Sequence, residues 1–397
     1  MKTFYNIYLF FALYFYRILA WICGVFLRRQ NASDGVLFLE NFPIENAGYQ
    51  YRVGKWKTEF EKNGLRCEVW TLIKDREEFD KLTESPSRFM TIAMRKRFRQ
   101  CIYSRRYNTV IVRRELLLYN DYGNLFMDRF LLKIHPNVIL DFDDDISASK
   151  REPRTIVSIY GKLMGECGNK FNDSLKLYRR FVVGSNYLKG KVLSENKNID
   201  DNAVLVMPTC VDYDEYPAKV YDGGATEIVL GWIGGNHNLH YLDMLVEQLN
   251  RLAADYKFKL VVVAGRDYEN TEAKFRIENQ RWSLDSEKDL IRSFDVGLMP
   301  IEDNIVGRGK CGFKLLQYMG LGVVGVATNV TVNGEIIEDG KNGFLVKPDN
   351  SNWYEELKKV LSLQENLSDI GKIARRTVEE RYSFSANVWR YMDFVKR

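Results

Sequence analysis

Three cations lie close together where a glycine-containing loop leads into an expected helix. Arg308 and Lys310 fall in the loop, and Lys314 falls in the first turn of the helix. Cations are unfavourable at the positive end of a helix dipole, so this arrangement indicates an anionic ligand such as a diphosphate. Gln317, one turn further, is placed to hydrogen-bond a pair of ligand hydroxyls. The alternative is a solvated basic turn with no ligand.

A second loop, Gly231-Trp-Ile-Gly-Gly-Asn-His-Asn238, follows an apolar strand and opens a helix. Gly234 and Gly235 allow the backbone to approach a ligand closely, and the N–H groups at the helix start, beginning with Asn236, can bind phosphate. A tight turn that serves only packing is the alternative. We favour a solvated or helix-capping role for the nearby His237 and His240 over a catalytic one.

An acidic run, Asp141-Phe-Asp143-Asp144-Asp145, ends an apolar strand in the first half of the chain. Like charges at close range are unfavourable unless water, a cation or substrate hydroxyls meet them. We expect Asp143 and Asp144 to bind the acceptor of a reaction and name them as the candidate catalytic residues; base assistance is a further role open to them, although a dedicated base need not exist. A solvated acidic turn and a metal site are the alternatives.

These loops connect two series of short apolar strands that alternate with helices. Strands apolar on both faces belong to parallel sheets covered by helices, and a stretch from Pro208 to Gly224 between the two series resembles a linker. The sequence therefore predicts an α/β protein with two doubly wound, Rossmann-like domains, residues 34–210 and 225–380, whose ligands bind at the carboxyl ends of the strands. Residues 381–397 are expected to form a C-terminal helix that packs back on the first domain. The expected strands are Val36–Leu39, Cys67–Leu72, Val110–Val112, Val138–Leu140, Phe181–Val183 and Val204–Met207, then Ile228–Ile233, Leu260–Ala264, Val296–Met299, Val323–Ala327 and Gly343–Val346.

Residues 1–30 form a separate segment, an apolar run long enough for a helix that reaches across a bilayer of roughly 30 Å. Its polar residues share one face, and Ala20 and Gly24 lie on the same stripe. This pattern favours a helix in the membrane interface, or a tilted span with one packed stripe. A cleaved signal peptide and a buried helix of the globular body are the alternatives, although Arg28-Arg29 follows the run in place of a small-residue cleavage site.

A basic amphipathic stretch from Phe89 to Tyr103 adds a second membrane signal, because its cations attract anionic lipid. The alternative is an ordinary solvated basic helix. Together the two segments predict attachment to the cytoplasmic side of a membrane, anchored or peripheral through residues 1–29. The cations of the stretch are Arg95, Lys96, Arg97 and Arg99, with Arg105 and Arg106 just beyond.

Composition narrows the class of protein further. The 46% of hydrophobic residues excludes a disordered chain, and a net charge of +5 is too small for a dedicated nucleic-acid binder. The six cysteines include no CxxC pair and there are three histidines, so the chain favours a reducing compartment and disfavours a zinc site.

The C-terminal half resembles the retaining nucleotide-sugar glycosyltransferases of the GT-B fold, in particular family 4. Leu315-Leu316-Gln317-Tyr318-Met319 resembles the family's Leu-Leu-Glu-Ala-Met helix, Gly322–Ala327 its next strand, Glu335 its later glutamate, and Asn342–Pro348 its last element. A subgroup with Lys-Cys-x-x-Lys before this helix is especially similar. Gln317 and Gly309 replace the two glutamates of the family signature, so the resemblance does not identify the donor sugar.

The resemblance also implies roles for individual residues. Gly234, Gly235, Asn236, Arg308, Lys310, Lys314, Gln317 and Glu335 would bind the donor, with the three cations replacing an Arg and a Lys that the family has after the first strand of this domain. The loop Asn46-Ala-Gly48-Tyr-Gln-Tyr-Arg52 resembles the family's glycine loop, which faces donor phosphate and acceptor; an ordinary turn is its alternative. Such enzymes usually stabilise the leaving diphosphate with cations and helix dipoles, so no metal or other cofactor is expected.

The resemblance thus implies a membrane-associated glycosyltransferase that moves a sugar from a nucleotide-diphosphate sugar to a glycan or lipid-linked acceptor, with retention of configuration. Two alternatives remain. One is a nucleotide-sugar-binding subunit that has lost catalysis, and the other is a nucleotide-sugar epimerase on the same scaffold. Nucleic acid is not an expected partner.

Overall fold

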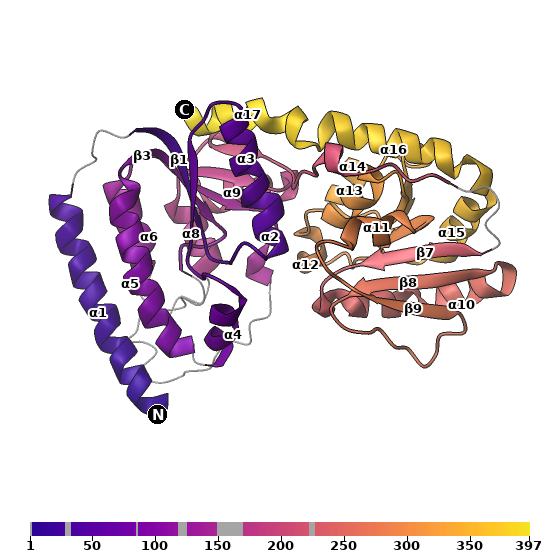
Figure 1. Cartoon of the computed structure of the whole chain (residues 1–397), viewed down its shortest axis with the longest axis horizontal. Helices are drawn as coiled ribbons and strands as arrows, with labels where there is room; N and C mark the ends of the chain where they lie inside the picture. The colour runs from indigo at the N-terminus through magenta and orange to yellow at the C-terminus, as the bar shows by residue number, and fades with distance from the viewer. Residues whose placement is uncertain (1, 28–32, 85, 118–124, 149–169, 222–226) are drawn as a thin grey trace. The chain divides into compact units, whose positions relative to one another are not determined.

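The computed structural model describes residues 2–27, 33–84, 86–117, 125–148, 170–221 and 227–397. The chain forms two compact units (Figure 1). The first unit combines Met1–Pro208 with Val388–Arg397, and the second is Thr209–Asn387.

The first unit is built on a six-stranded parallel sheet of order β2-β1-β3-β4-β5-β6. Its central strands are buried on both faces, as their uninterrupted apolar sequences predict. The strands are β1 (Ser33–Glu40), β2 (Cys67–Thr71), β3 (Tyr107–Arg113), β4 (Val138–Phe142), β5 (Arg180–Val183) and β6 (Val204–Val206).

Helices cover this sheet, and one apolar cluster joins them to it. The N-terminal helix α1 contributes Leu9, Leu13 and Ala20 to the cluster, and Figure 1 shows α1 running beside α5 and α6. The helices are α1 (Lys2–Phe26), α2 (Ala47–Tyr49), α3 (Lys55–Lys62), α4 (Arg76–Glu84), α5 (Pro86–Ser104), α6 (Phe126–Ile134), α8 (Lys170–Leu177) and α9 (Asn186–Glu195), with a π-helical turn at Gln50–Gly54.

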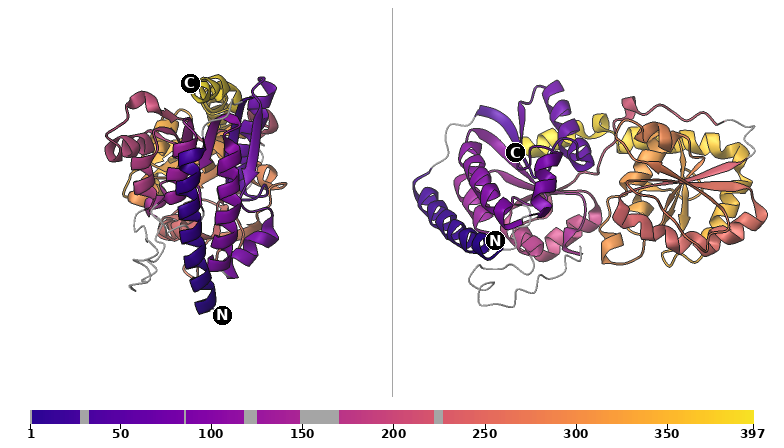
Figure 2. Two further views of the ribbon diagram at one scale, coloured as in Figure 1. Left: turned by 90° about the vertical axis from the view of Figure 1, so that its left-hand side faces the viewer. Right: turned by 60° about the horizontal axis from the view of Figure 1, so that its bottom comes forward.

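The second unit has its own six-stranded parallel sheet, of order β12-β11-β10-β7-β8-β9. The right-hand view of Figure 2 shows its strands at the centre with helices on both sides. The strands are β7 (Ile228–Ile233), β8 (Phe258–Ala264), β9 (Arg276–Arg281), β10 (Val296–Met299), β11 (Val324–Thr328) and β12 (Phe344–Val346). The helices are α10 (Val246–Asp255), α11 (Glu287–Arg292), α12 (Ile305–Arg308), α13 (Phe313–Gly320), α14 (Val332–Ile336), α15 (Trp353–Ser362) and α16 (Leu367–Arg381), with a 3-10 segment at Asn236–Leu245.

The last helix, α17 (Phe384–Lys396), begins in the second unit and ends in the first. Within the first unit the Tyr391 ring packs edge-on against Trp56, with ring centroids 4.8 Å apart. The hydroxyl of Thr109 on β3 donates to the carbonyl of Val395 over 2.7 Å. The end of α17 is therefore an integral layer of the first unit.

The strand order of the second unit locates its ligand edge. The chain runs from β7 outward to β9 and then returns to β10 beside β7, so the carboxyl ends of β7 and β10 flank the point where the winding reverses. Ligands of doubly wound sheets bind in the crevice outside such a point. The predicted α/β fold with two parallel sheets is confirmed, and β9 is the one strand of the described residues that the sequence analysis did not identify.

Candidate functional site

The two glycine-containing loops of the second unit lie against each other at this edge. A side-chain Cβ at Gly234 would come within 2.7 Å of Lys314 Cε and 2.6 Å of the Trp232 ring. The Lys314 ammonium lies 5.5 Å from the centroid of that ring, within range of a cation–π contact. The structure therefore brings together the loop after β7 and the first turn of α13, which are about 80 residues apart in the sequence.

Helix α13 begins at a position that requires glycine. Gly312 has a φ of +69°, and a Cβ there would lie 2.8 Å from Ile336 Cδ1. The N-cap residue is Gly312, so no N-cap side chain competes for the N–H groups of the first turn. This terminus and Lys314 together offer an anion both hydrogen-bond donors and a positive charge.

The other two predicted cations differ in their surroundings. Arg308 forms a two-point ion pair with Asp303, with Nε–Oδ1 and Nη2–Oδ2 distances of 2.6 and 3.1 Å, on an exposed surface. The hydrogen bond from Arg308 lowers the pKa of Asp303. The half-buried side chain of Lys310 makes no hydrogen bond or ion pair with any residue that the structure describes, while its backbone N–H donates to the Gly307 carbonyl over 3.1 Å. Of the three predicted cations, Arg308 is thus the one held in a described ion pair, while the Lys314 ammonium lies over the Trp232 ring.

The side chain of Gln317 forms a hydrogen bond with another residue of the protein, Glu287. Its amide nitrogen donates to Glu287 Oε1 over 2.7 Å, and Glu287 Oε2 accepts from the indole N–H of Trp282 over 2.6 Å. Gln317 and Glu287 are buried. Glu287 could not be identified from the sequence, because a single glutamate at the start of the polar helix α11 gives no signal of burial.

The turn from β11 into α14 adds polar groups that the sequence analysis also missed. Buried Asn333 donates to the Thr328 carbonyl over 3.0 Å, while its Oδ1 is buried with no hydrogen-bond partner among the described residues. That oxygen lies 3.6 Å from where a Gly312 Cβ would be. Thr331, with a φ of +39°, occupies a strained conformation for a non-glycine residue. The predicted Glu335 follows on α14 with an exposed side chain.

Asn236 lies over the ends of two strands. Gly235 precedes the 3-10 segment, and a Cβ at Gly265, after β8, would come within 2.8 Å of Asn236 Oδ1. Exposed His240 contacts the His237 carbonyl through Nδ1 over 2.8 Å. The site of the second unit therefore consists of backbone, cations and amides, with both histidines on an exposed turn.

In the first unit, the predicted acidic residues lie within an ion-pair network. Asp143 is 6% exposed and accepts from Arg113 over 2.6 Å and from Arg114 over 3.2 Å. Burial alone would raise the pKa of Asp143, but the two guanidinium groups outweigh it and hold that pKa well below its usual range. Half-buried Asp144 lies 3.3 Å from Arg114 and has one buried oxygen without a hydrogen-bond partner in the described region. Asp144 is thus the more accessible of the two carboxylates.

The segment after β1, predicted as a glycine loop, is helical over Ala47–Tyr49 and Gln50–Gly54, and it has an exposed end and a buried end. Exposed Asn46 accepts from the Gly48 N–H over 2.8 Å, a local turn contact. Arg52 is 1% exposed and holds Asp141 through two bonds of 3.1 and 3.0 Å, with a further bond of 2.6 Å to the Met207 carbonyl. Arg52 therefore ties the loop to β4 and to the end of β6, and only the Asn46 end is at the surface.

The described residues contain no group of three or more His, Cys, Asp or Glu side chains arranged to hold a metal ion.

The helix α1 is apolar and long enough over Ile7–Phe26 to cross a membrane, with a mean hydropathy of 1.9.

Comparisons with known proteins place the second unit in a sequence family. Residues 227–363 match the family described as "Glycosyl transferases group 1". This segment contains the loop after β7, α13 and the turn before α14. No curated protein sequence matches the chain.

Solved structures are similar over nearly the whole chain. A glycosyltransferase from Rickettsia africae has a TM-score of 0.63 at 16% identity, covering 92% of this chain and 98% of the other. Sucrose-phosphate synthase from Thermosynechococcus elongatus has a TM-score of 0.66 at 11% identity, with the same coverage. Anabaena HepE in complex with UDP-glucose has a TM-score of 0.58 at 13% identity, covering 91% and 99%. The chain therefore has the GT-B glycosyltransferase fold, with a glycosyl transferases group 1 domain at residues 227–363.

Proposed function

We propose that this protein transfers a sugar from a nucleotide-diphosphate sugar to a glycan or lipid-linked acceptor, with retention of configuration. The observation that carries the proposal is the position of Lys314, at the uncapped start of α13 and against Gly234. Negative charge develops on the diphosphate as the bond to the sugar breaks. A fixed cation and helix N–H groups stabilise that charge more strongly in the transition state than in the bound donor.

The neighbouring groups complete a donor site. The backbone of Gly234 and Gly235 leaves room for the diphosphate, because any side chain at Gly234 would fill the space beside Lys314. Lys310 supplies a second charge from the loop before α13. Helix α14, which contains Asn333 and Glu335, is the proposed contact for the sugar, since it offers a buried amide oxygen close to Gly312 and an exposed carboxylate.

The proposed chemistry places the proton on the leaving diphosphate. The acceptor hydroxyl attacks the anomeric carbon on the face that the diphosphate leaves, a new C–O bond forms as the old one breaks, and a phosphate oxygen takes the hydroxyl proton. A separate protein base is therefore not required.

In the first unit Asp144 is the proposed contact for acceptor hydroxyls, and the buried Asp143 holds Arg114 beside it.

Transfer assays with a panel of nucleotide sugars test the proposal. Because HepE was solved with UDP-glucose, that compound is the first donor to try. We expect donor-dependent glycosylation of a glycan or lipid-linked acceptor, an unchanged rate in EDTA, and the donor's anomeric configuration in the product by NMR. Binding without transfer or hydrolysis would instead identify a binding subunit, and conversion of free nucleotide sugar without acceptor would identify an epimerase.

A further inference from the structure

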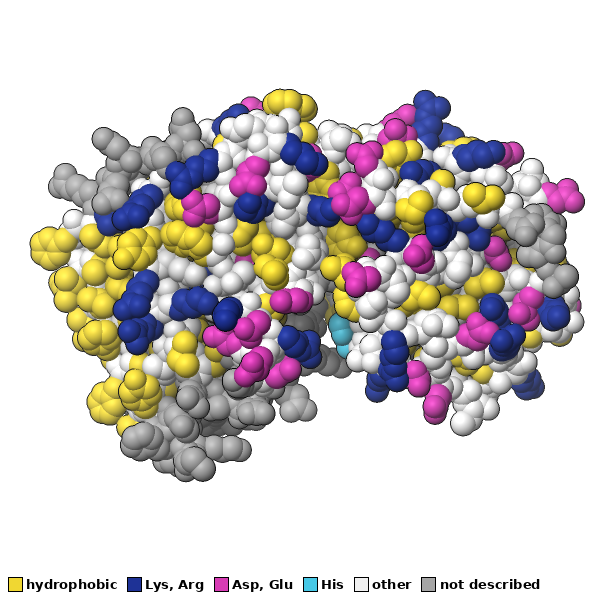
Figure 3. All heavy atoms as spheres, viewed as in Figure 1, with side chains coloured by type: hydrophobic (Ala, Val, Ile, Leu, Met, Phe, Trp, Pro, Cys, Tyr) yellow, Lys and Arg dark blue, Asp and Glu magenta, His cyan; other side chains and the backbone are white. Residues whose placement is uncertain are grey.

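Helix α1 has two faces with different surroundings. On one face Leu9, Leu13, Ala20 and Gly24 are buried against the first unit. On the other, large apolar side chains are between 40% and 77% exposed, and Figure 3 shows hydrophobic side chains gathered over this helix. We call this second face the apolar face of α1. It consists of Ile7, Tyr8, Phe11, Phe15, Ile18, Trp21, Ile22, Val25 and Phe26.

The buried face follows the first unit along most of the helix. From Leu9 to Gly24 the helix rises about 22 Å, at about 1.5 Å per residue. Midway, the Tyr16 ring lies 5.6 Å from the Phe98 ring of α5, and near the end Gly24 lies against the side chain of Lys133 of α6. A helix attached to a protein surface over this length cannot be surrounded by lipid. The geometry is that of a helix lying along a membrane surface.

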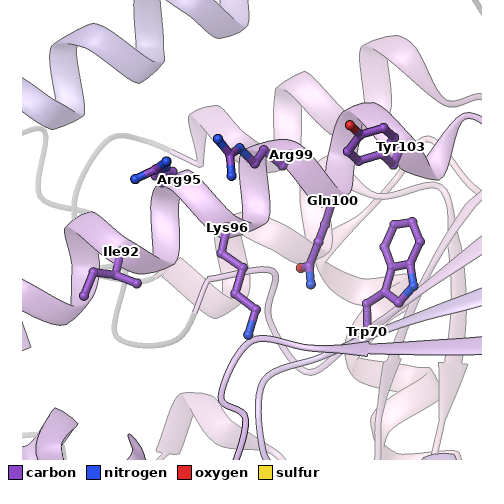
Figure 4. A pocket seen from close by; sticks show the side chains of 7 residues that line it. All are labelled: Trp70, Ile92, Arg95, Lys96, Arg99, Gln100 and Tyr103. Atoms are coloured by element: carbon purple, nitrogen blue, oxygen red, sulfur yellow. The ribbon is translucent and has the colours of Figure 1, made fainter.

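A basic hollow lies next to the apolar face. Along α5, Ile92, Arg95, Lys96, Arg99, Gln100 and Tyr103 line a cavity of about 430 Å³, with Trp70 of β2 opposite (Figure 4). Arg95 and Ile92 also line a second hollow, together with Tyr8, Phe11 and Phe15 of α1. Arg95 thus connects the basic hollow to the apolar face.

The charge of this hollow is not neutralised by the described part of the protein. Exposed Arg95 and Arg99 form no ion pair with a described acidic residue. Lys96 donates to the Leu72 carbonyl over 2.7 Å, forms no ion pair with a described residue, and is within electrostatic range of Glu78. The expectation that Arg97 joins this surface is wrong: Arg97 is buried and bonds the carbonyls of Leu116 and Glu40.

We propose that the hollow around Arg95 and Arg99 binds the phosphate of an anionic phospholipid headgroup while the apolar face of α1 lies among the acyl chains. We choose an anionic phospholipid as the ligand because its phosphate is complementary in charge to the arginines of the hollow. Two unpaired guanidinium groups suit a phosphate, and the adjoining aromatic and aliphatic side chains suit the hydrocarbon below it. This proposal concerns a surface outside the donor site, so it stands or fails independently of sugar transfer.

Vesicle binding tests the headgroup site. The full-length chain should bind vesicles of phosphatidylcholine with phosphatidylglycerol more tightly than vesicles of phosphatidylcholine alone. The variant R95Q/R99Q should lose this preference, with about tenfold or greater weakening on the anionic vesicles. The control K372Q/R376Q removes the same charge at the same spacing from exposed α16, and it should bind like the wild type.

Two further experiments test the role of the apolar face of α1 and its orientation in the membrane. F11S/F15S should weaken binding to both vesicle types, whereas W389S, at another exposed aromatic side chain, should not. A protease-cleavable tag on the N-terminus should be fully cut on sealed vesicles if α1 lies in the plane. Three outcomes would each overturn the proposal. The tag could be protected from the protease, or R95Q/R99Q and its control could lose vesicle binding equally. The third outcome is a thermal shift with inorganic phosphate but no preference for anionic lipid.

Discussion

Gln317 donates a hydrogen bond to Glu287 over 2.7 Å, and both side chains are buried in the second unit. An amide is a good partner for a buried carboxylate, because it supplies an N–H donor and adds no second negative charge. The glutamine at position 317 therefore matches its carboxylate partner from α11. The position is therefore tied to packing between α11 and α13.

The substitution Gln317→Glu should destabilise the protein in a pH-dependent way. Two buried carboxyl groups would meet at hydrogen-bond distance, and ionising both is unfavourable. One of them must be protonated, so the free energy of unfolding should fall as pH rises through about 4 to 6 and stay lower at pH 7, by about 2 kcal/mol or more. Urea unfolding at several pH values measures this. Gln317→Met, which adds no charge, should show no such slope, and an equal slope in both variants would contradict the explanation.

Replacing Lys314 by Ala should weaken donor binding and leave the fold intact. In the proposed donor site the half-buried ammonium supplies a charge-assisted contact to the diphosphate, and losing that contact should cost about 1.5 to 3 kcal/mol, or roughly tenfold to a hundredfold in Kd. Calorimetry with the donor identified by the panel measures the change. Lys372→Ala, at an exposed lysine on α16, is the control. Donor affinity that is equal in the two variants would remove Lys314 from the site.

Gly234→Ala tests the close approach of the two loops. The new methyl group would meet the Trp232 ring at 2.6 Å and Lys314 Cε at 2.7 Å. Because Trp232 is buried, the strain must displace Lys314 or the loop, at about 1 to 3 kcal/mol. We expect weaker donor binding with little loss of secondary structure by circular dichroism. Gly190→Ala is the matched control, since a Cβ there has no atom within 4 Å; donor affinity unchanged in Gly234→Ala would contradict the geometry.

Most of the fold was predictable because its strands are short apolar runs between glycine and polar turns. The exception, β9, has the sequence Arg-Ile-Glu-Asn-Gln-Arg and lies at the edge of its sheet. Its burial is partial, and its charges pair locally, as Glu278 does with Lys259 over 2.9 Å. An edge strand needs no apolar run, so periodicity gives no signal for it.

The candidate site was predictable at positions where the backbone conformation or a close contact requires glycine. Glycines at 234 and 312 lie at turns that exclude side chains, and each marks a loop that the sequence identifies separately. The resemblance to a known family then joined the two loops in one hypothesis. Side-chain partners were not predictable. Asp303, which pairs with Arg308, and Glu287 are ordinary acidic residues in the sequence, and only the tertiary structure shows what they contact.

Asp143→Asn tests whether the acidic run of the first unit is primarily structural. Removing this carboxylate leaves Arg113 and Arg114 without it, which should cost about 3 kcal/mol of unfolding free energy at pH 7. Since the folded pKa of Asp143 lies below the unfolded value of about 3.9, its contribution is complete above that value and is lost as pH falls. The difference between wild type and variant should therefore be constant from about pH 7 to 5 and shrink below about 4. Asp201→Asn, at an exposed ion pair with Lys189, should cost less than about 1 kcal/mol. Equal stability of Asp143→Asn and wild type, with a loss of transfer alone, would instead assign Asp143 to the acceptor.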